Sequence, residues 1–346
     1  MSFKKKILLV ADVRGWAYDD ASQNWKALLS KEYDIDIIYL SDYKTLKMTH
    51  GIVRFFRQMQ TSAFNGESID PKDFLNYYKL FTNEKGQATP PIFNHNDYDG
   101  ILFFYHRAVC DYRLLNTPFP LDKVAISINN EKWVGEENLV FEHYFKGSRV
   151  LTGCNQFVID KFKNIHPNVM RVSQSINQKV FNVRRKAITS DRKGAEFIVG
   201  WSGNFSNTIK NYSLVKAACK TAKVKLLTAK KLDRAALNVW YNKVDAVICA
   251  SDSEGGPLML LEAGACAVPV ITVPVGLSRE IIKNGQNGLI VDRTPRSISK
   301  AINRLQANKQ ERLSFAVKLN KEILDNWTYE SRVDEVRAVF KEICKS

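Results

Sequence analysis

VDAVICASDSEGGPLMLLEAGACAVPVITV (residues 244–273) contains, in order, the patterns of a strand, a polar turn, a helix and a second strand. The run VDAVICAS (244–251) is apolar and rich in β-branched residues, which is typical of a buried strand. A glycine-containing turn follows at 253–257, and VPVITV (268–273) is the next apolar run. A strand, a helix and a strand in this order predict parallel strands packed against helices.

The turn at 253–257 places the start of a helix beyond the end of the first strand. We expect Pro257 to be the first helical residue, because that position needs no N–H. Leu258, Leu261 and Ala265 then follow at helical spacing. The free N–H groups and the dipole of a helix start favour an anion such as a diphosphate. The glycines before the helix would let a ligand approach the backbone closely.

The same alternation of strands and helices runs through the whole chain. We expect further strands at 4–12, 35–40, 100–105, 123–128, 150–153, 169–173, 197–203 and 224–229. The polar, basic segment 182–196 is expected to be a linker between two halves. The prediction is an α/β fold of two doubly wound, Rossmann-like domains, residues 1–185 and 186–327, that face each other across a cleft. Ligands of such sheets bind beyond the carboxyl ends of the strands.

Composition and motifs exclude several classes of protein. The chain has 346 residues, 45% of them hydrophobic, which fits two domains with buried cores. Its six cysteines form no C-x-x-C pair, so we expect neither a disulfide framework nor a zinc site. The D-x-D triplets at 34–36 and 97–99 lie where strands begin, which is the wrong end for a metal site. No P-loop and no G-x-G-x-x-G motif is present, which argues against a P-loop nucleotidase and a dinucleotide oxidoreductase.

The apolar stretches are too short for a membrane span or a secretory signal. The longest, 263–277, contains two prolines and two glycines, and the run Ile7–Ala11 ends at Asp12. We therefore expect a cytoplasmic protein.

The formal net charge of +15 would suit nucleic acid, an anionic membrane or phosphorylated substrates. The basic residues are spread along the chain, so nucleic acid is not expected as a partner, although a basic nucleic-acid-binding protein stays an alternative. RFFR (54–57) and the lysines at 4–6 could contact the inner face of an anionic membrane peripherally. The segment around 54–57 could equally be a helix packed on the sheet.

SEGGPLMLLEAGACAVPVI (253–271) resembles the E-x7-E signature of the family 4 glycosyltransferases, which are retaining enzymes of the GT-B fold. GLSREIIKNGQNGLIV (276–291) resembles the segment that follows it in that family, and the resemblance is strong from about 197 to 291. ILDNWTYESRVDEVRAVF (323–340) is similar to the family's last helix, which crosses back to the first domain. The resemblance therefore implies that 328–346 form a returning C-terminal helix.

The resemblance implies roles for individual residues. Glu254 would contact the donor sugar and Glu262 the nucleotide ribose, since a carboxylate can accept hydrogen bonds from two adjacent hydroxyls. Lys210 would bind the phosphates and offset charge on the leaving diphosphate, so Glu254 and Lys210 are the candidate catalytic residues. The other implied donor-site residues are Gly15, Ser202, Gly203, Asn204, Thr228, Gly255, Gly256, Leu258 and Met259. From the residues alone, Glu262 could instead be a solvated helix residue and Glu254 a cap.

Two positions depart from the family pattern. Asn204 stands where the family usually has an arginine, and Asn129, Asn130 and Glu131 follow the strand after which many members have a histidine. Asn130 and His106 are the candidates for the acceptor side. These departures leave open a catalytically inactive GT-B partner subunit as an alternative.

The resemblance implies transfer of a hexose or N-acetylhexosamine from a nucleoside-diphosphate sugar, with UDP favoured over GDP. The acceptor would be a hydroxyl of a glycan, a lipid-linked or an anionic cell-envelope molecule, and the anomeric configuration would be retained. The expected partners are thus a nucleotide-sugar donor and a glycan or lipid-linked acceptor. No cofactor and no metal are expected, because Lys210 and the helix N-terminus would supply the positive charge.

Overall fold

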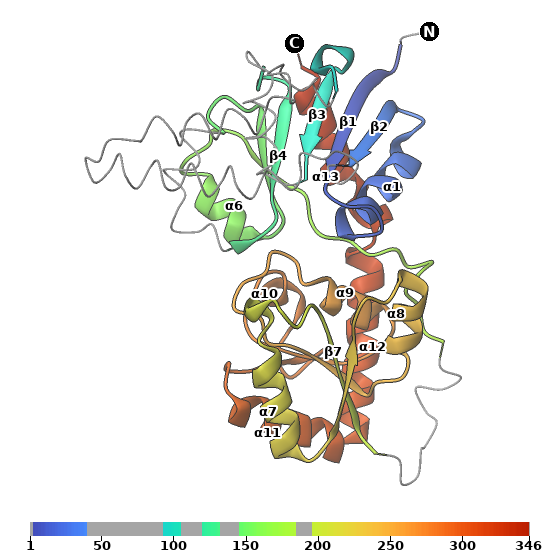
Figure 1. The fold of residues 1–346 in the computed structure, drawn as a ribbon, viewed down its shortest axis with the longest axis vertical. Helices are drawn as coiled ribbons and strands as arrows, with labels where there is room; N and C mark the ends of the chain where they lie inside the picture. Colours follow the sequence, from blue (N-terminus) through green and yellow to red (C-terminus); the bar gives the residue numbers. More distant parts are fainter. Residues whose placement is uncertain (1–2, 40–92, 105–119, 132–144, 185–195, 346) are drawn as a thin grey trace, which may run out of the picture.

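Two parallel β-sheets, each formed by one half of the chain, are the framework of the molecule. The computed structural model describes residues 3–39, 93–104, 120–131, 145–184 and 196–345, and every structural statement below concerns these residues. The first sheet has the strand order β2-β1-β3-β4-β5-β6, and the second has the order β11-β10-β9-β7-β8. In Figure 1 the first sheet lies above the second. The prediction of two doubly wound α/β domains is confirmed.

The first sheet is buried on both faces. Its strands are β1 (Lys5–Ala11), β2 (Tyr33–Tyr39), β3 (Gly100–Phe103), β4 (Val124–Ile128), β5 (Val150–Gly153) and β6 (Val169–Arg171), and the helices of this half include α1 (Ala17–Leu29), the 3-10 turn η2 (His95–Asp97) and α6 (Gln156–Phe162). Ile7 and Leu9 of β1 pack in the same cluster as residues of α1, whereas Leu8 and Val10 pack with residues of α6. This burial on both faces explains why β1 is a continuous apolar run.

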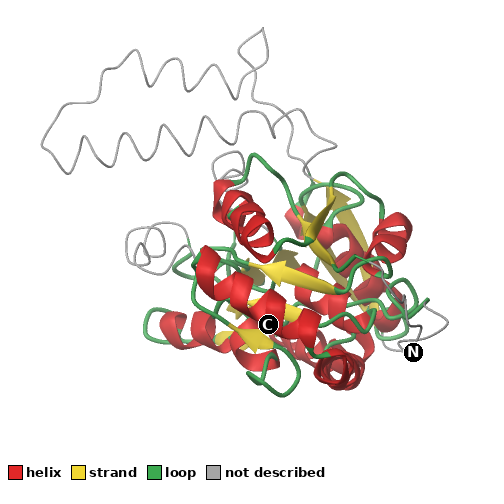
Figure 2. Ribbon diagram, turned by 90° about the horizontal axis from the view of Figure 1, so that it is seen from below, coloured by secondary structure: helices red, strands yellow, loops and turns green. Residues whose placement is uncertain are grey.

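The second sheet has the same construction. Its strands are β7 (Ile198–Ser202), β8 (Lys225–Ala229), β9 (Ala246–Cys249), β10 (Val270–Thr272) and β11 (Leu289–Ile290), and its helices are the 3-10 turn η4 (Thr208–Lys210), α7 (Tyr212–Ala222), α8 (Arg234–Tyr241), α9 (Leu258–Ala265), α10 (Ser278–Ile281), α11 (Pro295–Ala307) and α12 (Lys309–Asn326). All strand pairs are parallel. Helices lie on both sides of the strands (Figure 2).

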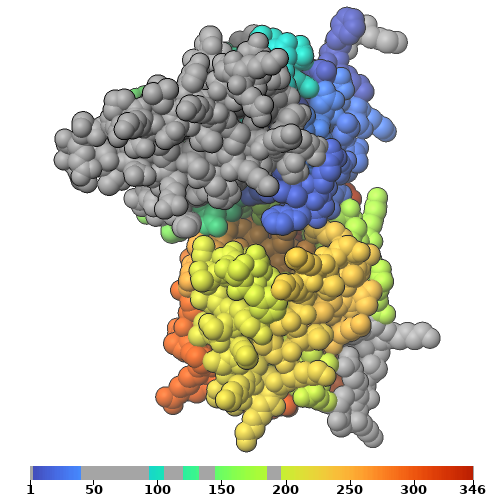
Figure 3. Space-filling view, in the orientation of Figure 1, coloured from blue at the N-terminus to red at the C-terminus, as the bar shows by residue number. Residues whose placement is uncertain are grey.

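The last helix, α13 (Tyr329–Ile343), leaves the second half and packs in the first. Its Tyr329, Val336 and Phe340 lie in one hydrophobic cluster with Ile7 and Trp25. In Figure 1, α13 lies beside β1 and α1, above the second sheet. The space-filling view shows residues of the first half (blue) directly above those of the second half (yellow and orange, Figure 3).

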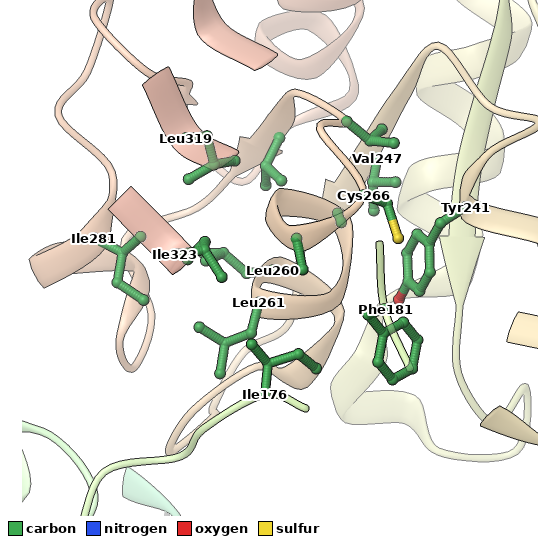
Figure 4. Packing of buried hydrophobic residues seen from close by; sticks show 14 of the residues in the cluster. Ile176, Phe181, Tyr241, Val247, Leu260, Leu261, Cys266, Ile281, Leu319 and Ile323 are labelled. Atoms are coloured by element: carbon green, nitrogen blue, oxygen red, sulfur yellow. The ribbon is translucent and has the colours of Figure 1, made fainter. Parts of the chain in front are cut away.

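Helix α9 lies inside the hydrophobic core of the second half of the chain rather than on its surface. Leu260 and Leu261 pack among residues of α10, α12 and the segment after β6, as Figure 4 shows. Pro257 has a ψ of 100° and precedes the helix, so the prediction that it is the first helical residue is wrong by one position. Its extended ψ lets its carbonyl accept a hydrogen bond from Leu260 N at 2.9 Å. Every residue of α9 after Leu258 and Met259 is buried, so the helix is enclosed nearly all round.

Several sequence predictions concern residues that the structure does not describe. RFFR (54–57), His106 and Cys110 lie outside the described residues. The structure shows no disulfide among the other cysteines, and all of these except Cys344 are buried. Within the described ranges, no helix combines the length and the apolar character that crossing a bilayer requires.

Candidate functional site

A cavity of about 400 Å³ lies between the two sheets, at the carboxyl ends of their strands. Its walls come from the turns after β4, β7, β8 and β9, from the start of α1 and from the first turns of α9. The predicted site residues that line it are Ser202, Gly203, Lys210, Glu254, Gly255, Gly256, Leu258, Met259 and Glu262. Folding therefore brings most of the predicted donor site to one place, at the edge where parallel α/β sheets bind ligands.

Lys210 and Glu254 form a close ion pair at this cavity. The Nζ of Lys210, at the end of η4, lies 2.5 Å from Oε1 of Glu254 in the turn after β9. The exposed fractions of the two side chains are 31% and 12%. Burial opposes the charge of the ammonium, but the Glu254 carboxylate outweighs it, so the pKa of Lys210 lies above its ordinary value. Lys210 thus presents a permanent positive charge to any anion in the cavity.

Glu262, one helical turn into α9, is almost completely buried, with 5% of the residue exposed. Arg234 Nη1 lies 3.0 Å from its Oε1, and the Tyr241 hydroxyl donates to its Oε2 at 2.7 Å. Burial raises the pKa of the Glu262 carboxyl, and Arg234 and Tyr241 offset this only in part. The alternative that Glu262 is a solvated helix residue is therefore wrong.

The N-terminus of α9 faces the same cavity without a side-chain cap. Pro257, not Glu254, occupies the cap position, so the alternative reading of Glu254 as a cap is also wrong. The first N–H groups of an α-helix have no acceptor within the helix, and the helix dipole adds partial positive charge there. Leu258 and Met259 line the cavity at this point. The arrangement can bind an anionic group.

The two glycines of the turn are required by contacts with the first half of the chain. A Cβ on Gly255 would lie 2.2 Å from the carbonyl oxygen of Asn129, and a Cβ on Gly256 would lie 2.4 Å from Cγ of Gln174. The Gly255 carbonyl accepts hydrogen bonds from Leu277 N at 3.0 Å and from Asn155 Nδ2 at 2.8 Å. The turn that carries Glu254 is thus held by the first half as well as by the second.

Four predicted residues do not line the cavity. Asn204 caps its own turn, with its Oδ1 accepting from Ser206 N and Oγ. Thr228 is paired with Trp201 in the sheet. Gly15 has a φ of 75° and shapes the turn before α1, while Asn130 Oδ1 accepts a hydrogen bond from Ser253 Oγ at 2.6 Å.

The cavity also contains residues that the sequence did not identify. Tyr18, Asn129, Gln174, Lys231 and Leu232 line it. Asn129 could have been found, because it directly follows a predicted strand and so lies at the ligand-binding edge of the sheet. The other residues carry no such signal in the sequence.

The acidic triplets at 34–36 and 97–99 form ion pairs with lysines of β1. Lys6 lies 3.3 Å from Asp36, in the middle of β2, and Lys5 lies 2.9 Å from Asp99, just before β3. In the part of the chain that the structure describes, no group of three or more histidine, cysteine or acidic side chains could hold a metal ion.

Comparisons with known proteins identify a glycosyltransferase domain in the second half of the chain. Residues 190–321 match the family model described as Glycosyl transferases group 1. An uncharacterized glycosyltransferase of Methanocaldococcus jannaschii is 31% identical over 121 residues, which is 35% of this chain and 34% of that protein. The chain thus matches only about a third of the length of this curated relative.

Solved structures resemble the chain over nearly its full length. Sucrose-phosphate synthase from Thermosynechococcus elongatus superposes with a TM-score of 0.71 at 13% identity, over 98% of this chain and 99% of that one. HepE from Anabaena, solved in complex with UDP and glucose, superposes with a TM-score of 0.63 at 11% identity, over 97% and 99%. The chain therefore carries a glycosyl transferases group 1 domain at residues 190–321 and has the GT-B fold, which confirms the predicted fold and the assignment to glycosyltransferases at the level of the domain.

Proposed function

We propose that the chain is a retaining glycosyltransferase that moves a hexose or N-acetylhexosamine from a nucleoside-diphosphate sugar to an acceptor hydroxyl. One observation carries the proposal: Lys210, Glu254, Glu262 and the start of α9 share a single cavity between the sheets. The volume of about 400 Å³ is in the range of small-molecule sites. A cation, a helix N-terminus and two carboxylates match the phosphates and hydroxyls of a nucleotide sugar.

The diphosphate would lie against the α9 N-terminus and Lys210. During transfer the bond between the anomeric carbon and the diphosphate breaks, and negative charge develops on the leaving diphosphate. Preorganised donors and a fixed cation stabilise such charge at little cost of reorganisation. Without ligand, the Lys210 ammonium is engaged by Glu254 at 2.5 Å. A diphosphate would compete for this ammonium, which would free a Glu254 oxygen to accept a hydrogen bond from the donor sugar.

Glu262 would bind the ribose. Its carboxylate is buried and oriented by two donors, and its helix also carries the N-terminus that we assign to the diphosphate. The proposed donor thus extends along the first turns of α9, with the sugar near Glu254 and the ribose near Glu262. We propose that no metal is required, since Lys210 and α9 supply the positive field.

The proposal also includes the base and the acceptor. We favour UDP, and HepE of the same fold was solved with UDP and glucose. The acceptor would be a glycan, a lipid-linked or an anionic cell-envelope hydroxyl that enters from the first half of the chain. Cytoplasmic location with peripheral contact to the inner face of a membrane is part of the same proposal.

Two measurements test the proposal. A thermal-shift screen with UDP, GDP, ADP and their sugar conjugates should show one base series that raises the melting temperature with concentration, because ligands stabilise the state that binds them. With the conjugate found, Glu254→Ala should lower turnover by about 100-fold or more, since a residue that contacts the reacting sugar is removed.

The control is Glu311→Ala, which removes a partly exposed carboxylate that pairs with Arg304 and does not line the cavity. Near-normal turnover by Glu254→Ala would refute the assignment of this residue. Nucleotide binding without any transfer or donor hydrolysis would instead support the inactive partner subunit.

A further inference from the structure

Arg234, the first residue of α8, joins the two halves of the chain at the donor site. Its Nη1 lies 3.0 Å from Oε1 of Glu262 in α9, and its Nη2 lies 3.3 Å from Oδ2 of Asp20 in α1. We propose that Arg234 is a positioning residue that orients Glu262 for the ribose hydroxyls and makes nucleotide binding depend on contact between the halves. The inference rests on the proposed donor function.

The charges and the burial of this group explain why the guanidinium is needed. The exposed fractions of the side chains are 6% for Glu262, 17% for Asp20 and 23% for Arg234. Two carboxylates in such a place are disfavoured by desolvation and repel each other. The planar guanidinium can donate to both at once, whereas a lysine ammonium is a compact charge without this fork.

The hydrogen bonds of Glu262 leave acceptor capacity for a ligand. Oε1 faces Arg234 and Oε2 accepts from Tyr241. A carboxylate oxygen can accept two hydrogen bonds, so each oxygen keeps one acceptor position. Two acceptor positions on one fixed carboxylate match the 2′- and 3′-hydroxyls of a ribose. Loss of Arg234 would leave Oε1 of Glu262 without its donor, so the carboxylate would no longer be held in the orientation that fits the two hydroxyls.

The contact with Asp20 extends the effect to the first half. Asp20 Oδ2 also accepts a hydrogen bond from the Tyr329 hydroxyl at 3.0 Å, at the start of α13. Ala17 and Tyr18, in the same first turn of α1, line the cavity. The ion pair therefore fixes this wall of the cavity against the ribose ligand Glu262. By thermodynamic linkage, a nucleotide that binds Glu262 in this arrangement also stabilises the ion pair of Arg234 with Asp20, and the ion pair in turn favours nucleotide binding.

Titration calorimetry with UDP and 2′-deoxy-UDP, or with the GDP pair if the wild-type chain binds that base, tests the inference. Arg234→Met should weaken binding of the ribonucleotide about 10- to 100-fold, because a charge-assisted hydrogen bond is lost. The ratio of the affinities for the ribonucleotide and the deoxyribonucleotide should also move toward one. The KM for the donor should rise by a larger factor than kcat falls. Arg234→Lys should restore part of the preference.

Asp20→Asn tests the link to the first half. This variant keeps Arg234 on Glu262, so we expect both nucleotides to bind about 3- to 10-fold more weakly with an unchanged ribose preference. Arg279→Met is the matched control, since Arg279 forms another ion pair between the halves, 2.5 Å from Glu131, and does not line the cavity. It should leave the ribose preference as in the wild type.

Different results overturn different statements. Equal weakening of both nucleotides by Arg234→Met, with Arg234→Lys no better, would show a merely structural arginine. Unchanged affinities in Asp20→Asn would overturn the link between the halves, and this variant serves the test even if Arg234→Met does not fold. A wild-type chain that binds no nucleoside diphosphate would overturn the proposed function itself, whereas wild-type binding with an unaltered preference in Arg234→Met overturns only this inference.

Discussion

Replacement of Gly255 by alanine should move the two halves of the chain apart at the cavity and leave each half folded. The new Cβ would lie 2.2 Å from the Asn129 carbonyl oxygen and 2.6 Å from Sγ of Cys154. Both atoms belong to the first half, and one is backbone, so a rotamer change cannot relieve the contact. The groups must separate by roughly 1 Å or more to reach an ordinary contact distance.

The size of the effect follows from what this separation breaks. The buried hydrogen bond from Asn155 Nδ2 to the Gly255 carbonyl, 2.8 Å long, would be stretched, and a buried polar group left unpaired costs about 1–3 kcal/mol. We expect the two halves to shift relative to each other while each core stays packed, so the free energy of unfolding should fall by only about 1–2 kcal/mol, within the range for overpacking. Turnover should fall more, since displacement of a reactive group by about 1 Å can cost about 100-fold in rate.

The assay compares kcat/KM for the donor with urea unfolding of the same preparation. Gly264→Ala is the matched control: its Cβ would lie 2.5 Å from Cγ1 of Ile323, inside the second core. We expect the control to lower stability by about 1–3 kcal/mol, with kcat/KM reduced less than in Gly255→Ala. If Gly255→Ala keeps kcat/KM within threefold of the wild type, contact with the first half does not position the Glu254 turn, and the reasoning is refuted.

Three further predictions concern other parts of the chain. Thr328→Ala removes the capping box with Ser331 at the start of α13. It should lower the free energy of unfolding, measured in urea, by about 1 kcal/mol, and no change would mean that the capping box does not contribute to stability. Burial raises the pKa of Glu262 above its ordinary value of 4.5, so the folded state holds this proton more tightly and the contribution of Glu262 to the free energy of unfolding should fall as pH rises from that value. Glu262→Gln should lose this contribution to the slope in urea unfolding at several pH values, and an identical slope would contradict it. Turnover should persist in excess EDTA, and activity that is lost there and restored by Mg²⁺ would show that Lys210 and α9 do not suffice.

Much of the fold follows from local sequence patterns. Apolar runs bounded by glycine, proline and polar residues predicted strands such as β1 and β9 to within two residues, because a strand buried on both faces must be apolar throughout. The turn before α9 was predicted equally well, but the start of the helix was predicted one residue early, at Pro257. The dihedral angle ψ of that residue depends on how the turn docks, which spacing alone does not report.

Local sequence patterns were enough to predict the alternation of strands and helices, and the family resemblance indicated Lys210, Glu254 and Glu262. Only the tertiary structure showed that Glu262 is buried and which donors hold it, since Arg234 and Tyr241 reach it from α8. It also showed a second reason why the turn needs glycines, which is their close contact with Asn129 and Gln174 of the first half of the chain. Periodicity and turn chemistry act between neighbours in the chain, whereas burial, charge pairing and close packing depend on which elements meet in space.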